Sequence, residues 1–444
     1  MAFVPIYILI LGFTIAIDYT AGIMIENASG KRRNLFLIMS LIANIGMLAI
    51  FKYYNFITEN FNFLLHGFSP SHQLPYLKIL LPLGLSFHTF QAMSYTIEVY
   101  RGNQKAERHF GIYSLYVMFY PQLVAGPIER PQNLLHQFRE KFHFDYDRII
   151  SGLQLMGWGL FKKVVIADRL AVVVDFVYRS PYSHNSLSLI TATIFFAFQL
   201  FCDFSGYSDI AIGAARVMGF KLMTNFRSPY QSKSISEYWT RWHISLSTWF
   251  KDYILNPLGH KRDKGRMYLN IMIVFLISGL WHGSNWTFLL CGIIQGFYIV
   301  FGHITKKIRM RINKKLLLDK LPLLSILTTF GLVCFVYIFF RSDNLTTGFY
   351  IATHIFTGLP IIVSKLLHHQ SIFEYLGTSK ANLYLSFLLI IFIESIHFFQ
   401  ERINIEEYFN ARPIYLRWAV YFAAIGIIFL FGVFENRQFI YFQF

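Results

Sequence analysis

Apolar residues occur along this chain in long, nearly continuous blocks rather than at the three- and four-residue spacing of a helix that lies on a soluble protein. A helix that crosses a bilayer needs about 20 such residues. The blocks that reach or approach this length are Val4–Ile25, Asn34–Phe51, Leu77–Val99, Gly111–Ala125, Arg148–Phe161, Leu187–Phe204, Tyr268–Trp281, Trp286–Gly302, Leu321–Phe340, Asn382–Phe399 and Leu416–Phe434. The pattern predicts an all-α polytopic membrane protein with about eleven transmembrane segments.

Several of these blocks are short, or are interrupted by glycine and proline. At membrane depth such interruptions are tolerated where the backbone packs inside protein or lines a cavity, so they indicate a chamber within the helix bundle. The block Gly348–Leu367 fits the topology only as a re-entrant segment or at the outer interface. Neither a soluble domain nor an internal repeat of the kind common in secondary transporters is evident. We therefore expect residues 1–444 to form a single integral membrane domain.

Composition and charge support this class. The chain is 55% hydrophobic and only 14% charged, whereas a soluble domain typically has about 25% charged residues. The net charge is +16, but the basic residues gather beside apolar blocks, as the positive-inside rule describes, so we expect contact with the bilayer and none with nucleic acid. The basic runs are Lys31–Arg33, Arg101–Arg108, Lys261–Arg266 and Lys306–Lys315. Placing them in the cytoplasm puts the tail Glu435–Phe444 outside.

Standard catalytic and metal-binding signatures are absent from the sequence, so no metal site is predicted. The three cysteines, Cys202, Cys291 and Cys334, lie inside apolar blocks without CxxC spacing and are typical of small core residues. Val4–Ile25 contains Asp18 and lacks a basic n-region, so no cleavable signal peptide is predicted. The informative residues are then the ionisable ones inside apolar blocks, because a charge there is costly and indicates function by default.

His282 is the first candidate, because it follows an apolar run and is flanked by Gly279 and Gly283. Glycines let a ligand or a second helix approach the backbone closely. A neutral imidazole is a suitable general base near neutral pH, able to take a proton from an attacking hydroxyl. The alternative is a core histidine that is hydrogen-bonded to a neighbouring helix.

His243 is the second candidate, in a segment rich in tryptophan and charge from Ser236 to Tyr253. Helical spacing would put Trp239, Trp242 and Trp249 near one face, with Glu237 and Arg241 four residues apart and able to pair. From composition alone, an amphipathic helix at the membrane interface explains this segment better than catalysis does.

Three further features favour structural roles. Asp203 and Asp209 have neither one-face helical spacing nor a metal motif, so we expect buried acids that bond helix ends or arginines around a cavity. The proline-rich stretch Tyr120–Pro131 must interrupt a helix. Glu394 and His397 are three residues apart and are expected to satisfy each other.

Several stretches of the chain match a known family in order and nearly end to end. They are LPLGLSFHTFQAMSYTIEVYRG from Leu81, FYPQLVAGPIERP from Phe119, FCDFSGYSDIAIGAARVMGF from Phe201, EYWTRWHISLSTWFKDYILNPLG from Glu237, SGLWHG from Ser278 and FIYFQF from Phe439. Together they resemble the MBOAT superfamily of membrane-bound O-acyltransferases, in the bacterial branch that includes the alginate O-acetyltransferase membrane component. The resemblance implies a ring of helices around a central tunnel.

The resemblance also implies roles. His282 falls on the family's essential histidine and His243 on the second signature position of the branch. We expect acetyl-CoA as the donor substrate and no permanently bound cofactor, with Lys261 and Arg262 contacting coenzyme A phosphates at a basic cytoplasmic mouth. His282 would deprotonate the acceptor hydroxyl, and His243 would orient or polarise the thioester. The branch implies an extracytoplasmic SGNH-type acetyltransferase as partner, which would complete delivery to a polysaccharide outside the bacterial inner membrane.

The C-terminal tail is open to two interpretations. Its aromatic residues suit an interfacial anchor. Alternatively the tail folds back into the outer mouth of the tunnel, where Tyr441 would accept the acetyl group transiently, because a phenol is a fair nucleophile once a base takes its proton. Two alternative functions remain at this point: D-alanyl transfer to teichoic acid, and a transporter or scaffold without chemistry of its own.

Overall fold

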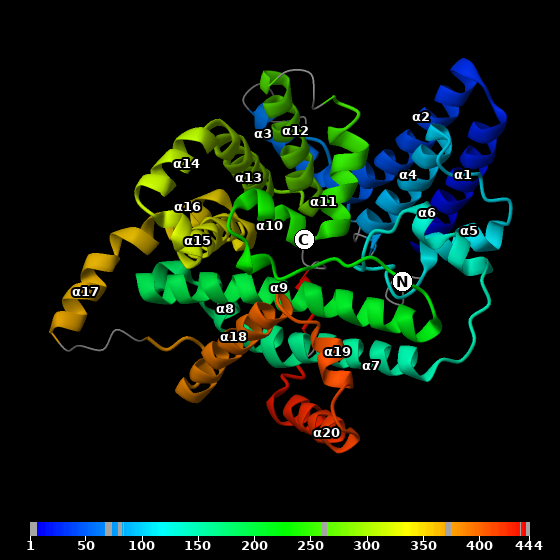
Figure 1. Ribbon diagram of the computed structural model, residues 1–444. Coiled ribbons are helices and arrows are strands. Elements are labelled where there is room, and N and C mark those ends of the chain that lie inside the picture. Colours follow the sequence, from blue (N-terminus) through cyan, green and yellow to red (C-terminus); the bar gives the residue numbers. More distant parts are fainter. Residues whose placement is uncertain are drawn as a thin grey trace. The chain divides into compact units, whose positions relative to one another are not determined.

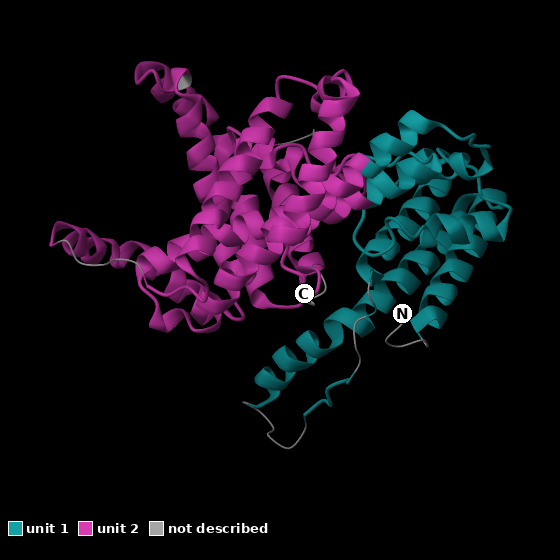
Figure 2. Cartoon of the chain, turned by 90° about the horizontal axis from the view of Figure 1, so that it is seen from below, with its two compact units in different colours: residues 1–153, 211–223 teal, residues 154–210, 224–444 magenta. Residues whose placement is uncertain are grey.

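All regular structure in the described ranges is helical, which confirms the predicted class. The structure is a computed structural model and describes residues 7–66, 73–78, 82, 84–259, 264–368, 374–435 and 437–440. Its helices pack as two compact units, shown in different colours in Figure 2. Unit 1 comprises residues 1–153 and 211–223, and unit 2 comprises residues 154–210 and 224–444. Each unit has its own apolar core, and the single-domain expectation stays a prediction.

Unit 1 is built mainly from α1, α2 and α4, which pack against one another (Figure 1). Its elements are α1 (Tyr7–Asn27), α2 (Gly30–Leu48), the π-helical η1 (Ala49–Tyr53), α3 (Tyr54–His66), α4 (Leu85–Arg101), α5 (Phe110–Met118), α6 (Pro131–Leu134), η2 (His136–Arg139), the start of α7 (Tyr146–Phe161) and the end of α9 (Ser186–Met218). The buried carboxylate of Asp18 joins two of these helices. It accepts hydrogen bonds from Ser40 at 2.6 Å and Asn44 at 2.9 Å.

The proline-rich stretch is a break, as predicted. Helix α5 ends at Met118, and the chain turns back so that the N–H groups of Gln122 and Leu123 both bond the carbonyl of Phe119 at 3.1 Å. The apolar block Gly111–Ala125 therefore does not form a continuous membrane-length helix, because Pro121 cannot extend the hydrogen-bond ladder.

Unit 2 holds the larger core, in which buried side chains of α8, α9, α13 and α15 meet. Its elements are the rest of α7 and of α9, the π-helical η3 (Lys162–Ala167), α8 (Asp168–Arg179), η4 (Pro181–Ser183), η5 (Pro229–Gln231), α10 (Ile235–Arg241), α11 (Ile244–Phe250), the π-helical η6 (Lys251–Leu255), α12 (Lys264–His282), α13 (Trp286–Ile304), α14 (Lys306–Lys315), η7 (Leu318–Lys320), α15 (Pro322–Arg341), α16 (Leu345–Thr357), α17 (Leu359–Leu367), α18 (Lys380–Gln400), α19 (Ile405–Asn410) and α20 (Ile414–Phe431).

Eight helical runs in the described ranges are long and apolar enough to cross a membrane. They are Tyr7–Asn27, Gly30–His66, Ser186–Met218, Trp286–Ile304, Pro322–Arg341, Leu345–Leu367, Lys380–Gln400 and Ile414–Phe431. The predicted blocks Arg148–Phe161 and Tyr268–Trp281 are helical in α7 and α12 but are not among the eight. The block Gly348–Leu367, expected to be re-entrant or interfacial, lies within one of the eight runs, Leu345–Leu367. In this run α16 ends at Thr357 and α17 begins at Leu359.

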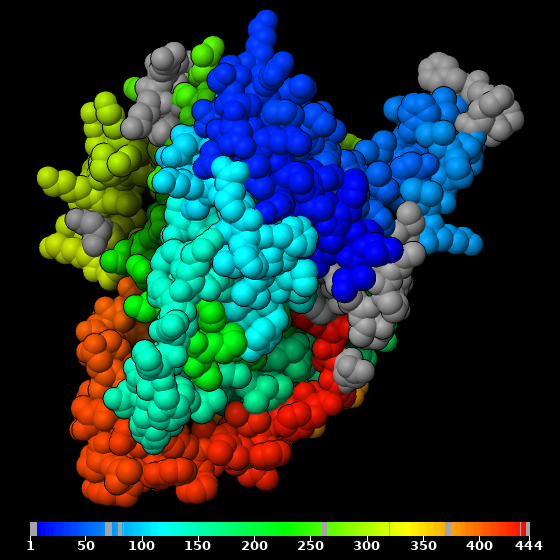
Figure 3. Space-filling model, turned by 90° about the vertical axis from the view of Figure 1, so that its right-hand side faces the viewer, coloured from blue at the N-terminus to red at the C-terminus, as the bar shows by residue number. Residues whose placement is uncertain are grey.

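Helix α20 is the most exposed of these eight runs. None of its residues is buried, and the red C-terminal region lies openly on the surface in Figure 3. Its exposed side chains are large and apolar, among them Phe422, Phe429 and Leu430. A helix that is apolar all round and exposed is suited to lipid rather than to water.

Candidate active site

His282 is the last residue of α12, at a close crossing with α13. A Cβ atom added at Gly279 would overlap the carbonyl oxygen of Phe288, and one at Gly292 would overlap the carbonyl oxygen of Phe275. Only glycine at both positions lets the two backbones come this near. Gly279 is thus required by the helix crossing. The crossing in turn fixes the position of the end of α12, which carries His282.

The His282 side chain lines a pocket inside unit 2. Side chains from α9, α10, α12, α13 and α15 form its walls, and the empty space of about 480 Å³ between them includes solvent at the open side. The polar groups of the lining are few: Ser278, the hydroxyls of Tyr238 and Tyr337, 2.6 Å apart, and the Trp239 indole, which donates to Gln295 Oε1 at 3.1 Å. An apolar pocket with few polar groups suits a site that excludes water around one reactive imidazole.

His243 is held in a tight turn between α10 and α11. Its backbone is left-handed, with φ 43° and ψ 55°, a conformation that is uncommon outside glycine and is maintained only by surrounding structure. Two backbone hydrogen bonds supply that structure: Arg227 N–H to the Arg241 carbonyl, and Ile244 N–H to the Asn225 carbonyl, both at 2.9 Å. The His243 side chain is fully buried.

The hydrogen bonds around His243 assign its tautomer. Asn225 Oδ1 lies 3.3 Å from Ser245 N and 2.9 Å from Ser245 Oγ, and Asn225 Nδ2 donates to Ser208 Oγ at 3.2 Å. Because a backbone N–H can only donate, the oxygen of the Asn225 amide faces Ser245. His243 Nδ1, 3.0 Å from the same oxygen, must therefore carry the proton. The lone pair is then on Nε2, the nitrogen that can accept a proton or a hydrogen bond.

Trp281 contacts both candidate histidines. The centroid of a Trp281 ring is 5.9 Å from that of His243 and 5.1 Å from that of His282. Burial lowers the pKa of His243 well below its usual range, and the nearby His282 acts in the same direction. His243 is therefore neutral at neutral pH. The structure thus brings the two predicted histidines into one aromatic cluster within unit 2.

The proposal of an exposed amphipathic helix around His243 is wrong in its geometry. The helix breaks between Trp242 and His243, so the three tryptophans do not share one helical face. Trp242 and Trp249 are only 3% and 2% exposed, whereas an interfacial belt would leave them at the surface. The segment is part of the buried core.

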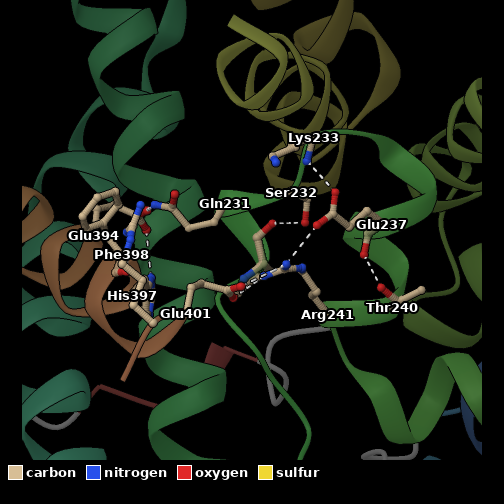
Figure 4. Close-up of polar contacts among 12 residues, drawn as sticks. Gln231, Ser232, Lys233, Glu237, Thr240, Arg241, Glu394, His397, Phe398 and Glu401 are labelled. Carbon is tan, nitrogen blue, oxygen red and sulfur yellow. Dashed lines mark hydrogen bonds and ion pairs between the residues drawn. The ribbon is translucent and has the colours of Figure 1, made fainter. Parts of the chain in front are cut away.

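A polar network joins the His243 segment to α18 (Figure 4). Arg241 pairs with Glu237 at 2.9 Å, which confirms the predicted pair, and also with Glu401 just beyond α18. Glu394 of α18 is bonded by His397 at 3.0 Å, also as predicted, and by Gln231 of η5. These contacts hold the ends of α10 and η5 against α18, so they support the turn that carries His243.

The two acids of α9 are paired with lysines rather than with arginines. Lys162 Nζ is 2.7 Å from Asp209, and Lys163 Nζ is 2.7 Å from Asp203 and 2.9 Å from Asp168. The expected arginine partners are therefore wrong, and the structural role of the two acids stays a prediction. The sequence does indicate that these lysines are unusual, since both directly follow an apolar block. Asn225 and Ser245, which fix the His243 tautomer, gave no such signal.

Three other predicted site residues cannot be placed. Lys261, Arg262 and Tyr441 lie outside the described residues. The chain is described up to Ile440, so the tail can be followed to the residue before Tyr441.

Comparison with known proteins decides the family. Residues 108–339 match the profile of MBOAT, the membrane-bound O-acyltransferase family. This chain belongs to that family. The matched range contains both His243 and His282 and every pocket-lining residue except Phe340, which directly follows it.

Relatives with assigned names fall into three groups. The peptidoglycan O-acetyltransferase of Helicobacter pylori is 35% identical over 77% of this chain and 68% of that protein. The probable alginate O-acetylase AlgI of Pseudomonas aeruginosa is 36% identical over 77% of this chain and 64% of that protein. The teichoic acid D-alanyltransferase of Bacillus subtilis is more distant, at 27% over 64% of this chain and 74% of that protein. The chain thus spans about two thirds of the first two relatives. The chain is therefore an O-acyltransferase and a multi-pass membrane protein.

Proposed function

We propose that this MBOAT protein moves an acetyl group from cytoplasmic acetyl-CoA to the outer side of a bacterial inner membrane, for O-acetylation of a polysaccharide such as alginate or peptidoglycan. The observation that carries the proposal is the pocket in which His282 faces a mainly apolar lining, with the neutral, tautomer-locked His243 in the same aromatic cluster. The O-acetyltransferases among its relatives are closer to the chain than the D-alanyltransferase is.

The two histidines take different roles in this proposal. A thioester is already activated, so transfer requires positioning, a base and charge stabilisation. His282 lines the pocket and deprotonates the acceptor hydroxyl. His243 was expected to orient or to polarise the thioester. Because its Nδ1–H is engaged by Asn225 and its pKa is low, Nε2 has no proton to donate to a carbonyl. The tautomer therefore supports an orienting role, in which Nε2 accepts a hydrogen bond.

The donor side rests on Lys261 and Arg262, which would contact coenzyme A phosphates at the cytoplasmic mouth. Charge reversal by Lys261→Glu with Arg262→Glu should raise the concentration of acetyl-CoA needed for half-maximal transfer. The effect should be larger at low salt, because exposed charge contacts are screened. Donor dependence equal to that of the unmodified protein in both salt conditions would mean that this basic run only sets topology.

Delivery runs through the C-terminal tail and a partner. We infer that Tyr441 accepts the acetyl group as an aryl ester: His282 takes the phenolic proton as the oxygen attacks, and returns it to the sulfur as the carbon–sulfur bond breaks, so that coenzyme A leaves as the thiol. An extracytoplasmic SGNH-type acetyltransferase then takes the acetyl group to the polysaccharide. Support comes from the tail itself, since Phe439 and Ile440 are buried, at 7% and 2% exposed, which an anchor lying at the surface would not require. Tyr441→Phe keeps the ring and removes only the oxygen, so it should stop transfer. Normal transfer without an acetylated C-terminal peptide would refute the relay.

The proposal as a whole is tested in proteoliposomes that contain the purified protein. Radiolabelled acetyl-CoA is supplied on one side, and acetyl incorporation is measured into the protein and, with the partner acetyltransferase added, into a polysaccharide on the other side. A D-alanyl carrier protein is supplied in a parallel experiment. Incorporation from acetyl-CoA supports the proposal. Incorporation from the D-alanyl carrier alone would assign the teichoic acid chemistry instead, and incorporation from neither donor would favour a transporter or scaffold.

A further inference from the structure

The described end of the chain, residues 432–435 and 437–440, is bound along its length to unit 2. Val433 N–H donates to the carbonyl of Val164 at 2.9 Å. Val164 lies in the π-helical segment η3, and such segments depart from the regular hydrogen-bond ladder, often at functional sites. Arg437 pairs with Asp175 of α8 at 3.0 Å. The tail therefore follows α8 and η3 rather than leaving the protein after α20.

The deepest of these contacts is made by Asp203 of α9. One of its carboxylate oxygens accepts the backbone N–H of Ile440 at 2.7 Å, and the other is 2.7 Å from Lys163 Nζ. Asp203 and Ile440 are 3% and 2% exposed. Lys163 also bonds Asp168, so it is fixed from two sides. The result is a rigid charged acceptor, buried in the core, that receives one specific N–H group of the tail.

Stability alone does not explain this arrangement. A buried ion pair loses much of its Coulombic gain to desolvation, and apolar residues of the same volume are often as stable or more so. What a carboxylate supplies and an apolar side chain cannot is a directional acceptor for a backbone N–H. The geometry of the Asp203 carboxylate is therefore suited to fixing the position of the C-terminal tail.

The segment that it fixes lies against the candidate active site. The Phe439 ring packs on Tyr207 at 5.1 Å and on Phe204 at 5.9 Å between centroids. The same Phe204 ring meets the His243 imidazole edge-on at 4.7 Å. One aromatic ring of α9 thus separates the docked tail from the tautomer-locked histidine.

We propose that Asp203, held by Lys163, is a positioning residue that clasps the backbone of the C-terminal tail beside the His243 turn. The docking stands on the contacts above, while its consequence for transfer rests on the proposed relay through Tyr441, the next residue after Ile440. A clasp on the backbone at Ile440 would restrict the positions open to the next residue. Restricting a reacting group in this way lowers the entropic cost of bringing it to its reaction partner and so raises the rate.

The test measures tail docking and acyl transfer separately, in the full-length protein in detergent. Phe439→Cys serves as a reporter, and its labelling rate with a maleimide-polyethylene glycol reagent reports how often the tail leaves its site; the three native cysteines are buried. The reporter is combined with Asp203→Ala and with Asp209→Ala, a matched control on the same helix that also pairs with a lysine. It is also combined with Ile440→Pro, which removes the N–H itself, and with Ile440→Val, which retains it.

Asp203→Ala and Ile440→Pro should each raise the labelling rate about tenfold or more, as expected when a hydrogen bond to a charged group is lost, whereas both controls should stay close to the parent. Acetylation of Tyr441 should fall in step with the labelling rate. Should Asp203→Ala not fold, Ile440→Pro still tests the clasp, because it leaves Asp203 and Lys163 in place, and Ile440→Val controls for the change in the buried Ile440 side chain. Unchanged labelling in Ile440→Pro overturns the proposal. Faster labelling with normal transfer keeps the clasp and removes the relay. His282→Ala should stop transfer without changing the labelling rate, so failure of the chemistry and failure of the clasp give different results.

Discussion

The crossing of α12 and α13 sets the position of His282, so a single methyl group there should disable the enzyme. In Gly279→Ala the new Cβ would overlap the carbonyl oxygen of Phe288 and would lie 3.2 Å from the carbonyl carbon and 3.4 Å from Cα of Gly292. All three neighbours are backbone atoms, which cannot rotate away. The two helices must therefore separate, or α12 must shift, by a distance approaching about 1 Å.

The magnitude follows from that displacement. Overpacking of this kind typically destabilises a protein by about 1–3 kcal/mol. A displacement of about 1 Å in a catalytic group can lower the rate by about 10²-fold. The matched control is Gly331→Ala in α15, the helix that carries Tyr337 and Phe340 of the pocket wall, because a Cβ atom at Gly331 meets no atom within 4 Å. That substitution should leave transfer unchanged and stabilise the helix by up to about 1 kcal/mol.

The assay compares both variants with the parent for acetyl transfer in proteoliposomes and for unfolding temperature in detergent. We expect Gly279→Ala to be folded, less stable than the parent and strongly impaired in transfer. Transfer in Gly279→Ala within about twofold of that in Gly331→Ala would show that the crossing does not control the position of His282.

Two further predictions concern His243. Asn225→Ala removes the acceptor that fixes the tautomer and should slow transfer about tenfold, with binding of acetyl-CoA retained; an unchanged rate would mean that the tautomer is irrelevant. The second is the pH dependence of stability, because the pKa of His243 is lower in the folded state than in the unfolded one. The free energy of unfolding is therefore unaffected by the protonation of His243 above the unfolded pKa near 6.5. It falls as the pH drops from there toward the folded pKa, by up to about 1.4 kcal/mol per pH unit. Unfolding temperatures at pH 7, 6 and 5 should therefore fall more steeply for the parent than for His243→Asn, and equal slopes would contradict the burial argument.

Much of the fold follows from hydropathy alone. The helical membrane class is confirmed, and most apolar blocks became helices, because an apolar run in a bilayer must satisfy its own backbone hydrogen bonds. The errors arose where local chemistry overrides hydropathy. Pro121 interrupted the run from Gly111. Lys162 and Lys163 concealed the continuous helical run from α7 through η3 into α8, since two of the acids that pair with them, Asp209 and Asp203, lie far along the chain.

The candidate site could be predicted only in part. His282 and His243 were identifiable because an imidazole in an apolar block is unusual. The break before His243 was not, since a left-handed turn at a non-glycine residue is imposed by the Asn225 segment, which is 18 residues away. The same limit applies to the tail. Its aromatic pattern suits both an anchor and a docked segment, and the contacts of the tail distinguish them, above all that between Ile440 and Asp203.

The central claim is that His282 performs the chemistry of acyl transfer. The most direct measurement is the initial rate of acetyl transfer from radiolabelled acetyl-CoA in proteoliposomes containing His282→Ala. His303→Ala serves as the control, because His303 lies on α13 away from the pocket lining. The account predicts that His282→Ala is folded and inserted but slower by about 10²–10⁴-fold, the usual contribution of a general base, while His303→Ala matches the parent. Transfer by His282→Ala at more than about half of the parent rate would contradict the assignment.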